Sequence, residues 1–214
     1  MKIPLANQLK KRQQVEISVL QDEMIRIVYS TSDDPVLHGG TSVWRCYSGK
    51  RFSEDLVFYS RSFPDLVDNF RRETTAAGLS ITKLKDTGNV IFSQVNDGRV
   101  EVRLEINHKH KVEGIPVRYE LADGSYTEVL SLSPNQIILE KIAAYSDRRF
   151  VRDIFDIYHL SSVTDDLSSI KERLSVFLDQ IERPVDEQIL RSLVYIGNPP
   201  TFERMIGELR RVTK

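Results

Sequence analysis

Residues 36–44 read VLHGGTSVW and residues 51–58 read RFSEDLVF, and these two stretches decide the fold. In chain order they predict a short strand, a pair of glycines, a helix and a second strand. The adjacent glycines, Gly39 and Gly40, let the backbone approach a phosphate closely, and the free amides of the following helix attract its negative charge. We therefore expect Gly39, Gly40 and Thr41 to form a triphosphate-binding turn.

An acidic residue stands beside this turn. Asp55 lies on the second predicted strand, where a carboxylate can hold the divalent cation that bridges the phosphates and the attacking oxygen. Paired glycines before a helix often serve only as a turn. The combination of the glycine pair with Asp55 therefore carries the interpretation, and neither feature would do so alone.

The composition limits the classes of protein to consider. With 30 basic and 31 acidic side chains among 214 residues, the chain has no overall attraction for nucleic acid, so a polyanion site must be a local patch. The single cysteine, Cys46, cannot form an internal disulfide, and neither a leader segment nor an apolar run of about 20 residues is visible. We expect a cytoplasmic protein without a membrane segment.

The hydrophobic pattern divides the chain near residue 131. A long helix is predicted around residues 17–28, and a second one over 64–77. Ser133 followed by a proline favours the start of a helix, and the sequence after it is mostly helical in character. We expect an α+β domain at residues 1–131 and a helical domain at 132–214. Strands are predicted at residues 79–85, 89–95, 99–107, 115–121 and 126–132, and helices at 134–147, 152–160, 167–181, 185–195 and 200–212.

Three motifs resemble those of the abortive-infection (AbiEii/AbiGii-type) toxin nucleotidyltransferases. They are the Gly-Gly-Thr turn, RFSEDL at residues 51–56, and EKIAA at 140–144 followed by RDIFDIY at 152–158. The resemblance implies an α+β fold, with a polymerase-β-like nucleotidyltransferase core built on a mixed sheet and a helical C-terminal region. It also implies transfer of a nucleotide from an NTP with Mg²⁺ or Mn²⁺, transfer RNA as an acceptor, and a cognate antitoxin.

One position departs from the family pattern. The family strand reads Asp-x-Asp, which places both carboxylates on one face because side chains alternate along a strand. Here the second position is Val57, whose hydrocarbon side chain cannot bind a hard cation. Glu54 points to the opposite face of a regular strand. Either Asp55 works with one metal ion, or a third acid compensates, or the site is catalytically inactive.

Glu105 is the candidate for a third acid. In residues 99–107 apolar side chains alternate with polar ones, and Glu105 belongs to the polar set with Arg103. This polar face either meets the metal ion or faces solvent. The resemblance favours Glu105 as a metal ligand together with Asp55, because the family carries an acid in this strand.

The helical region holds the remaining candidate site residues. Lys141 and Arg148 lie seven positions apart, near one face of a helix, where they can reach triphosphate oxygens or an RNA backbone. The resemblance implies that Lys141 contacts the nucleotide, that Asp153 completes the active site as a general base, and that Arg51 and Ser53 join the nucleotide site. The alternative is a solvated helix with exposed ion pairs.

Histidine and aromatic side chains have less specific interpretations. His38 directly precedes the glycine pair, where it either touches a phosphate or is satisfied by the backbone. His108 and His110 fit a solvated loop better than a metal site. Trp44 and Tyr59 fit core packing better than base stacking, as do Phe52 and Phe58.

Two functions follow from these observations. The first is a metal-dependent nucleotidyltransferase in which Asp55, Glu105, Lys141 and Asp153 carry the chemistry. The second is a catalytically degenerate protein on the same scaffold, which binds a nucleotide, an RNA or a partner protein without chemistry, because Val57 removes a ligand.

Overall fold

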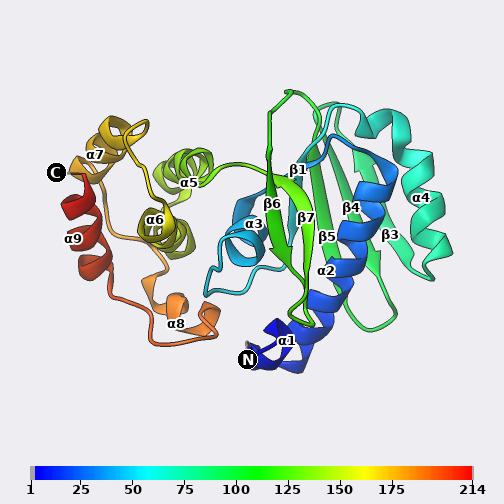
Figure 1. The fold of residues 1–214 in the computed structure, drawn as a ribbon, viewed down its shortest axis with the longest axis horizontal. Coiled ribbons are helices and arrows are strands. Elements are labelled where there is room, and N and C mark those ends of the chain that lie inside the picture. The colour runs from blue at the N-terminus through cyan, green and yellow to red at the C-terminus, as the bar shows by residue number, and fades with distance from the viewer. Residues whose placement is uncertain (1–2, 214) are drawn as a thin grey trace.

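The computed structural model describes residues 3–213, whose strands form one mixed sheet in the order β3-β4-β5-β2-β1-β7-β6. Helices α2 and α4 lie on one side of the sheet, while α3 and the C-terminal helices lie on the other (Figure 1). The strands are β1 (Val36–His38), β2 (Leu56–Tyr59), β3 (Ser80–Asp86), β4 (Val90–Asn96), β5 (Glu101–Asn107), β6 (Ile115–Glu120) and β7 (Tyr126–Ser131).

The helices follow the expected order along the chain, with most of them after residue 133. Two short 3₁₀ segments, at Phe63–Leu66 and Glu187–Ile189, precede α4 and α8 respectively. The α-helices are α1 (Leu5–Gln8), α2 (Arg12–Thr31), α3 (Gly39–Cys46), α4 (Val67–Ala76), α5 (Pro134–Arg148), α6 (Val151–Val163), α7 (Lys171–Asp179), α8 (Leu190–Leu193) and α9 (Phe202–Val212).

The middle of the sheet brings the two sequence motifs together. Strand β2 pairs antiparallel with β1 and parallel with β5, so His38, Val57 and Glu105 lie side by side across three strands. Directly paired residues point to the same face of a sheet. On β2, Leu56 and Phe58 point into the core on one face, and the half-buried Val57 and Tyr59 point to the other.

Each face of the sheet has its own hydrophobic core. The first core combines α2 and α4 with the inward face of the central strands, including Leu37, Leu56 and Phe58. The second combines the C-terminal helices with Val36 and Val43 from the N-terminal part of the chain. The helical region therefore packs directly on the β1–α3 unit. A boundary between two domains near residue 131 stays a prediction.

The start of α5 confirms the predicted helix signal. The Ser133 hydroxyl accepts a hydrogen bond from the Gln136 amide, and the Gln136 side chain accepts one from the Ser133 amide, which makes a complete capping box. The helix ends at Arg149, which adopts a left-handed conformation with φ of 52°. This turn lets α6 begin two residues later and run back against α5.

The helix predicted over residues 185–195 is largely wrong. Only a 3₁₀ turn and the one-turn helix α8 form there. The Val185 amide donates to the Arg149 carbonyl, and the Asp186 carboxylate accepts from the Val151 amide at the start of α6. These tertiary contacts fix the start of the segment against α6 and leave room for only short helical turns. The Phe52 amide donates to the Leu193 carbonyl, and the Tyr195 amide donates to the Lys50 carbonyl. These two backbone hydrogen bonds bring α8 beside the motif at residues 51–58.

Asp34 joins the turn before β1 to the turn after β2. Its carboxylate accepts hydrogen bonds from the hydroxyls of Ser32, Ser60 and Ser62 and from the amides of Arg61 and Ser62. Partial burial alone would raise the pKa of Asp34, but these donors lower it to about 2. The charged carboxylate is therefore the form that stabilises the fold.

Replacing Asp34 by Asn should destabilise the protein at neutral pH and much less in acid. Because the folded-state pKa lies below the ordinary value of 3.8, the stabilisation is present above about pH 4 and is lost as the pH falls toward 2. Urea unfolding at pH 7 and at pH 2.5 measures the difference. Asp33→Asn, at the exposed neighbouring position, is the control. An Asp34→Asn effect of equal size at both pH values would contradict this account.

Candidate active site

The glycine pair forms the junction between β1 and α3. Gly39 has a φ of +74°, which disfavours any side chain. A Cβ atom on Gly40 would lie 2.6 Å from a guanidinium nitrogen of Arg51 and 2.7 Å from the Ser53 hydroxyl. The Thr41 hydroxyl donates to the Asp55 carbonyl over 2.6 Å. The turn therefore packs directly against the second motif, as the sequence predicts.

A buried group of charges lies under this turn. Arg51 makes a bidentate contact with Asp156 of α6, with nitrogen–oxygen distances of 2.6 and 2.5 Å. Lys141 of α5 lies 2.8 Å from Asp156 and 3.2 Å from Asp153. Arg148 makes its own bidentate contact with Asp153, at 2.8 and 2.9 Å. These five residues, the charge cluster, join the sheet region to both long C-terminal helices.

The charge cluster carries an excess of positive charge. Three cations face two carboxylates, which leaves one positive charge. Burial alone would raise the pKa of Asp156, but the attraction of Arg51 and Lys141 lowers it below its ordinary value. The surrounding cations therefore stabilise the charged form of the Asp156 carboxylate. The side chain of Arg148 is 37% exposed, so the cluster reaches solvent on its Arg148 side.

A pair of carboxylates stands on the sheet beside the turn. Asp55 directly precedes β2, and Glu105 is the direct partner of Val57 on β5. Burial raises the pKa of Glu105, and the neighbouring Asp55 carboxylate raises it further. One Asp55 oxygen is buried without a hydrogen bond, although Arg103 forms an ion pair with it at 3.1 Å. The site thus lacks enough positive charge to neutralise both acids fully.

Three side chains meet on the other side of Val57. The Glu140 carboxylate of α5 contacts the His38 ring nitrogen Nδ1 at 3.0 Å and accepts a hydrogen bond of 2.7 Å from the Tyr59 hydroxyl. The rings of His38 and Tyr59 are stacked, with centroids 4.1 Å apart. His38 is therefore bound to a carboxylate, which neither of the interpretations from the sequence anticipated.

A hollow of about 280 Å³ opens in front of Asp55. Lys11 and Gln14 of α2 line one wall, Arg103 lines the sheet side, and Arg152 of α6 lines the helical side. The remaining lining residues are Arg51, Phe52, Ser53, Glu54, Asp55, Ser192 and Leu193. Basic side chains outnumber acidic ones around this hollow, so it suits an anionic ligand.

The donor set accommodates a metal ion only in part. Among residues 3–213, no group of three His, Cys, Asp or Glu side chains is arranged to hold a metal ion. Asp55 and Glu105 are two oxygen donors of the kind that Mg²⁺ and Mn²⁺ prefer. The Asp55 oxygen that lacks a hydrogen bond is the one paired with Arg103, and the pKa of Glu105 is raised by burial and by the Asp55 charge. An ion would need further ligands from the substrate or from water.

The structure brings the candidate residues from the sequence together at one place. Gly39, Gly40 and Thr41 contact the segment that carries Arg51, Ser53 and Asp55. Lys141, Arg148 and Asp153 belong to the charge cluster. Asp153 is fully buried with both oxygens paired, which leaves no free oxygen for a substrate proton.

Sequence reasoning missed several residues of this site. Asp156 follows Asp153 by three positions, and this helical spacing was the available signal for its role. Arg103 shares the polar face of β5 with Glu105. Lys11 and Gln14 reach the hollow only through the tertiary position of α2, so the sequence held no signal for them.

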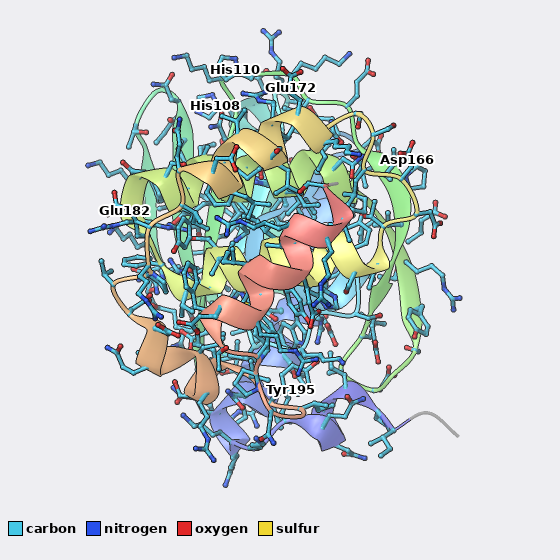
Figure 2. The ribbon with its side chains drawn as sticks, turned by 90° about the vertical axis from the view of Figure 1, so that its left-hand side faces the viewer. His108, His110, Asp166, Glu172, Glu182 and Tyr195 are labelled. Atoms are coloured by element: carbon cyan, nitrogen blue, oxygen red, sulfur yellow. The ribbon has the colours of Figure 1, made fainter. Side chains whose placement is uncertain are left out.

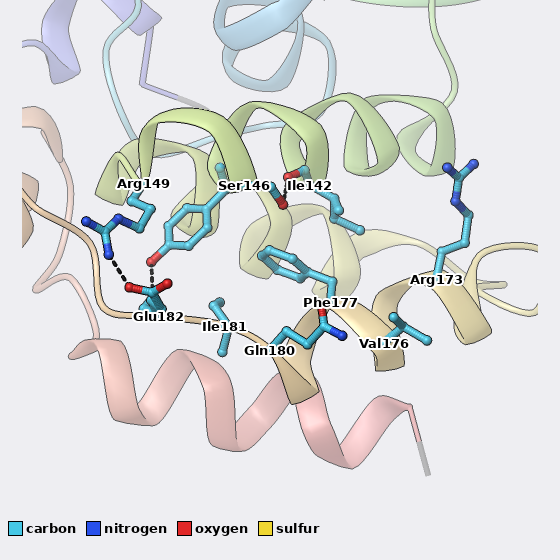
Figure 3. A pocket seen from close by; sticks show the side chains of 10 residues that line it. Ile142, Ser146, Arg149, Arg173, Val176, Phe177, Gln180, Ile181 and Glu182 are labelled. Atoms are coloured by element: carbon cyan, nitrogen blue, oxygen red, sulfur yellow. Dashed lines mark hydrogen bonds and ion pairs between the residues drawn. The ribbon is translucent and has the colours of Figure 1, made fainter.

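A second hollow, of about 330 Å³, lies between α5 and α7, away from the site (Figure 3). Its polar groups are largely paired with each other, since Arg149 contacts Glu182 and the Tyr145 hydroxyl donates to the Glu182 carbonyl. The apolar side chains of Phe177 and Ile181 form much of the rest. It contains no second acid, and we assign it no chemistry.

The fold and this site together define an α+β protein of the nucleotidyltransferase type. Two crystal structures from Helicobacter pylori share the fold, each with 23% sequence identity. A proposed nucleotidyltransferase superposes with a TM-score of 0.61, covering 95% of this chain and 94% of its own. JHP933 superposes with a TM-score of 0.60, covering 95% and 91%. A search of curated proteins found no match.

The family model of the AbiEii nucleotidyl transferase toxin of type IV toxin–antitoxin systems matches residues 26–210. The chain belongs to this family. The match includes the glycine turn, Asp55, Glu105 and the whole charge cluster. Within residues 3–213, no helix is long and apolar enough to cross a membrane.

Replacing Gly40 by Ala should lower the free energy of unfolding by roughly 1–3 kcal/mol, because the added methyl group must displace Arg51 and Ser53 from their present contacts. Urea denaturation followed by circular dichroism measures the change. Gly207→Ala in α9 is the matched control, since its Cβ would meet no atom within 4 Å and alanine favours a helix. Equal stability of Gly40→Ala and the wild type would refute the packing argument.

Proposed function

We propose that this protein is a metal-dependent nucleotidyltransferase that transfers a nucleoside monophosphate from an NTP to an acceptor hydroxyl. One observation carries the proposal. The glycine turn packs on the segment that carries Arg51, Ser53 and Asp55, and the net positive charge cluster binds the same segment through Arg51. Asp55 lines the hollow in front of this segment, and the Glu105 carboxylate lies close enough to Asp55 for the two charges to interact. Group transfer from a triphosphate needs positioning and electrostatic stabilisation more than covalent chemistry.

The triphosphate binds at the turn in this proposal. The first amides of α3 and the hydroxyl of Ser53 contact phosphate oxygens, and the excess positive charge of Arg51, Lys141 and Arg148 stabilises them. Asp156 keeps the Arg51 guanidinium in a fixed position through two hydrogen bonds. The acceptor hydroxyl gives up its proton to solvent as its oxygen attacks the α-phosphorus, the bond from that phosphorus to the bridging oxygen breaks, and pyrophosphate leaves.

Asp55 and Glu105 are the residues that would hold Mg²⁺ or Mn²⁺. When bound, the cation lowers the negative charge on the phosphates and favours the ionised form of the acceptor oxygen. Burial raises the pKa of Glu105, and the charge of Asp55 raises it further. Arg103 contributes a partial neutralisation of Asp55 before the substrate arrives.

We assign Asp153 a positioning role and not that of a general base. It is fully buried and binds Lys141 and Arg148 at once, so its charge keeps these cations directed at the phosphate site. Both of its carboxylate oxygens are occupied by these cations, so neither is free to accept a proton from the acceptor. The same argument applies to Asp156.

Transfer RNA as the acceptor, a cognate antitoxin as the regulator and a cytoplasmic location complete the proposal. Their support is membership of the type IV toxin–antitoxin family. The basic side chains of Lys11, Arg103 and Arg152 around the hollow are compatible with a polyanionic acceptor.

Asp55→Asn should reduce transfer by at least about a hundredfold while leaving the fold intact, because the amide binds a hard cation far more weakly than the carboxylate. The purified protein is incubated with each α-labelled NTP, Mg²⁺ or Mn²⁺, and total RNA, and label in RNA or protein is measured. Asp165→Asn, at an exposed position outside the hollow, is the control. Full activity of Asp55→Asn would disprove this metal site.

A second candidate function is a binding protein without catalysis, and Val57 favours it. This side chain lies between His38 and Glu105 in the strand register, where the family carries its second carboxylate. A hydrocarbon there removes one anchor for the metal ion.

Val57→Asp distinguishes the two candidates, because it restores an acid on the face that Glu105 shares. A strong gain of transfer over an inactive wild-type protein would identify a degenerate enzyme. Activity of the wild type with only a small further gain would support the first proposal. Val57→Asn is the control, because asparagine has nearly the same size as aspartate but carries no charge. Nucleotide binding, measured by calorimetry, verifies that each variant retains the site.

A further inference from the structure

A third hollow, of about 380 Å³, lies at the far end of β2 from Asp55. Tyr59 forms one wall, the turn at residues 60–62 a second, and the loop at residues 110–112 a third. Asp55, Val57 and Tyr59 alternate along one strand, so the hollow lies on the face that carries the candidate active site. Four residues of strand separate Asp55 from Tyr59, or roughly 13 Å.

The cations around this hollow have no partners. Among the described residues, Arg61, His110 and Lys111 form no ion pair, whereas most arginines elsewhere bind a carboxylate. The one acid in the lining, Asp34, is already committed to its five donors. Figure 2 shows His110 projecting at the end of the molecule opposite Tyr195. The hollow is therefore a local positive patch on a chain whose charges otherwise balance.

An aromatic ring stands in this patch with its orientation fixed. The Tyr59 hydroxyl donates to Glu140, and the His38 ring stacks on one face of the phenol ring. Tyr59 packs against the second hydrophobic core, as its sequence position indicates, and its half-buried side chain also lines the basic hollow. A fixed aromatic ring beside unpaired cations is the arrangement that binds single-stranded nucleic acid.

We propose that this hollow is a second nucleotide subsite, which holds one unit of a single-stranded nucleic acid acceptor. A base packs against Tyr59, and Arg61 and Lys111 contact the neighbouring phosphates. The inference deepens the proposed function, and rests on it only for the statement that the bound strand is the acceptor. The short path along β2 lets one strand occupy this subsite while its end reaches Asp55.

The test measures binding separately from catalysis. A fluorescein-labelled single-stranded RNA of eight uridylates is titrated with full-length protein in EDTA, and its anisotropy is followed at several salt concentrations. The double variant Arg61→Glu, Lys111→Glu should weaken binding by at least tenfold. Loss of two phosphate contacts should also reduce the slope of log K against log salt by about 1.4. Arg71→Glu, Lys83→Glu is the matched control, because both side chains are exposed and belong to α4 and β3.

Two substitutions at Tyr59 separate stacking from hydrogen bonding. Tyr59→Ala should weaken RNA binding about tenfold, whereas Tyr59→Phe keeps the ring and should bind within about twofold of the wild type. Thermal unfolding of each variant establishes that the fold persists. If Tyr59→Ala does not fold, the double variant at the exposed positions Arg61 and Lys111 still decides the outcome.

The outcomes distinguish this inference from the proposed function. Equal RNA affinity of the Arg61/Lys111 variant and the control pair would overturn the subsite. Unlabelled UMP and unlabelled octanucleotide are also compared as competitors of the labelled RNA, at equal concentrations of nucleotide. If UMP displaces the RNA as effectively as the octanucleotide does, the hollow is a site for free nucleotides, and the assignment to a strand is overturned. Weakened RNA binding in a protein without transferase activity would support the subsite and refute the enzyme.

Discussion

The bidentate contact between Arg51 and Asp156 is the interaction on which the rest of the structure depends. It joins the segment before β2 to α6 across a fully buried interface, and Lys141 and Asp153 extend it to α5. Removing one partner from such a network leaves an uncompensated buried charge, which typically costs about 3–5 kcal/mol. The same contact determines the sequence nearby, since only glycine at position 40 leaves room for the guanidinium.

This constraint also places the chemistry. Because Arg51 is fixed, the nearby residues Ser53 and Asp55 are positioned along the wall of the hollow. The hydrogen bond from the Thr41 hydroxyl to the Asp55 carbonyl holds α3 against the segment that leads into β2. The parallel pairing of β2 with β5 then brings Glu105 beside Val57. Two buried helices, one turn and three strands thereby converge on a site that no single element could form.

Local patterns in the sequence predicted much of this arrangement. The glycine turn, the alternation around Glu105 and the capping signal at Ser133 each act within a few residues, and the structure contains all three features. Tertiary contacts determine what the sequence could not show. Asp186 binds the start of α6, and the segment that follows it forms only a 3₁₀ turn and a one-turn helix, although its sequence has a helical pattern. The partners of His38 and Tyr59 likewise come from α5, about a hundred residues further along the chain.

The environment of Val57 bears directly on the missing carboxylate. A side chain at this position has His38 on one side and Glu105 on the other, and a Cβ atom added to Gly39 of the turn would lie 3.6 Å from it. Burial alone would raise the pKa of Glu140, but hydrogen bonds from His38 and Tyr59 lower it, so a charged carboxylate already stands close to this face. A second acid at position 57 would add to the negative charge of Asp55, Glu105 and Glu140. The valine therefore avoids a further carboxylate on a face that already carries acidic side chains, and an acid restored at this position would add a repulsion that only additional positive charge could offset.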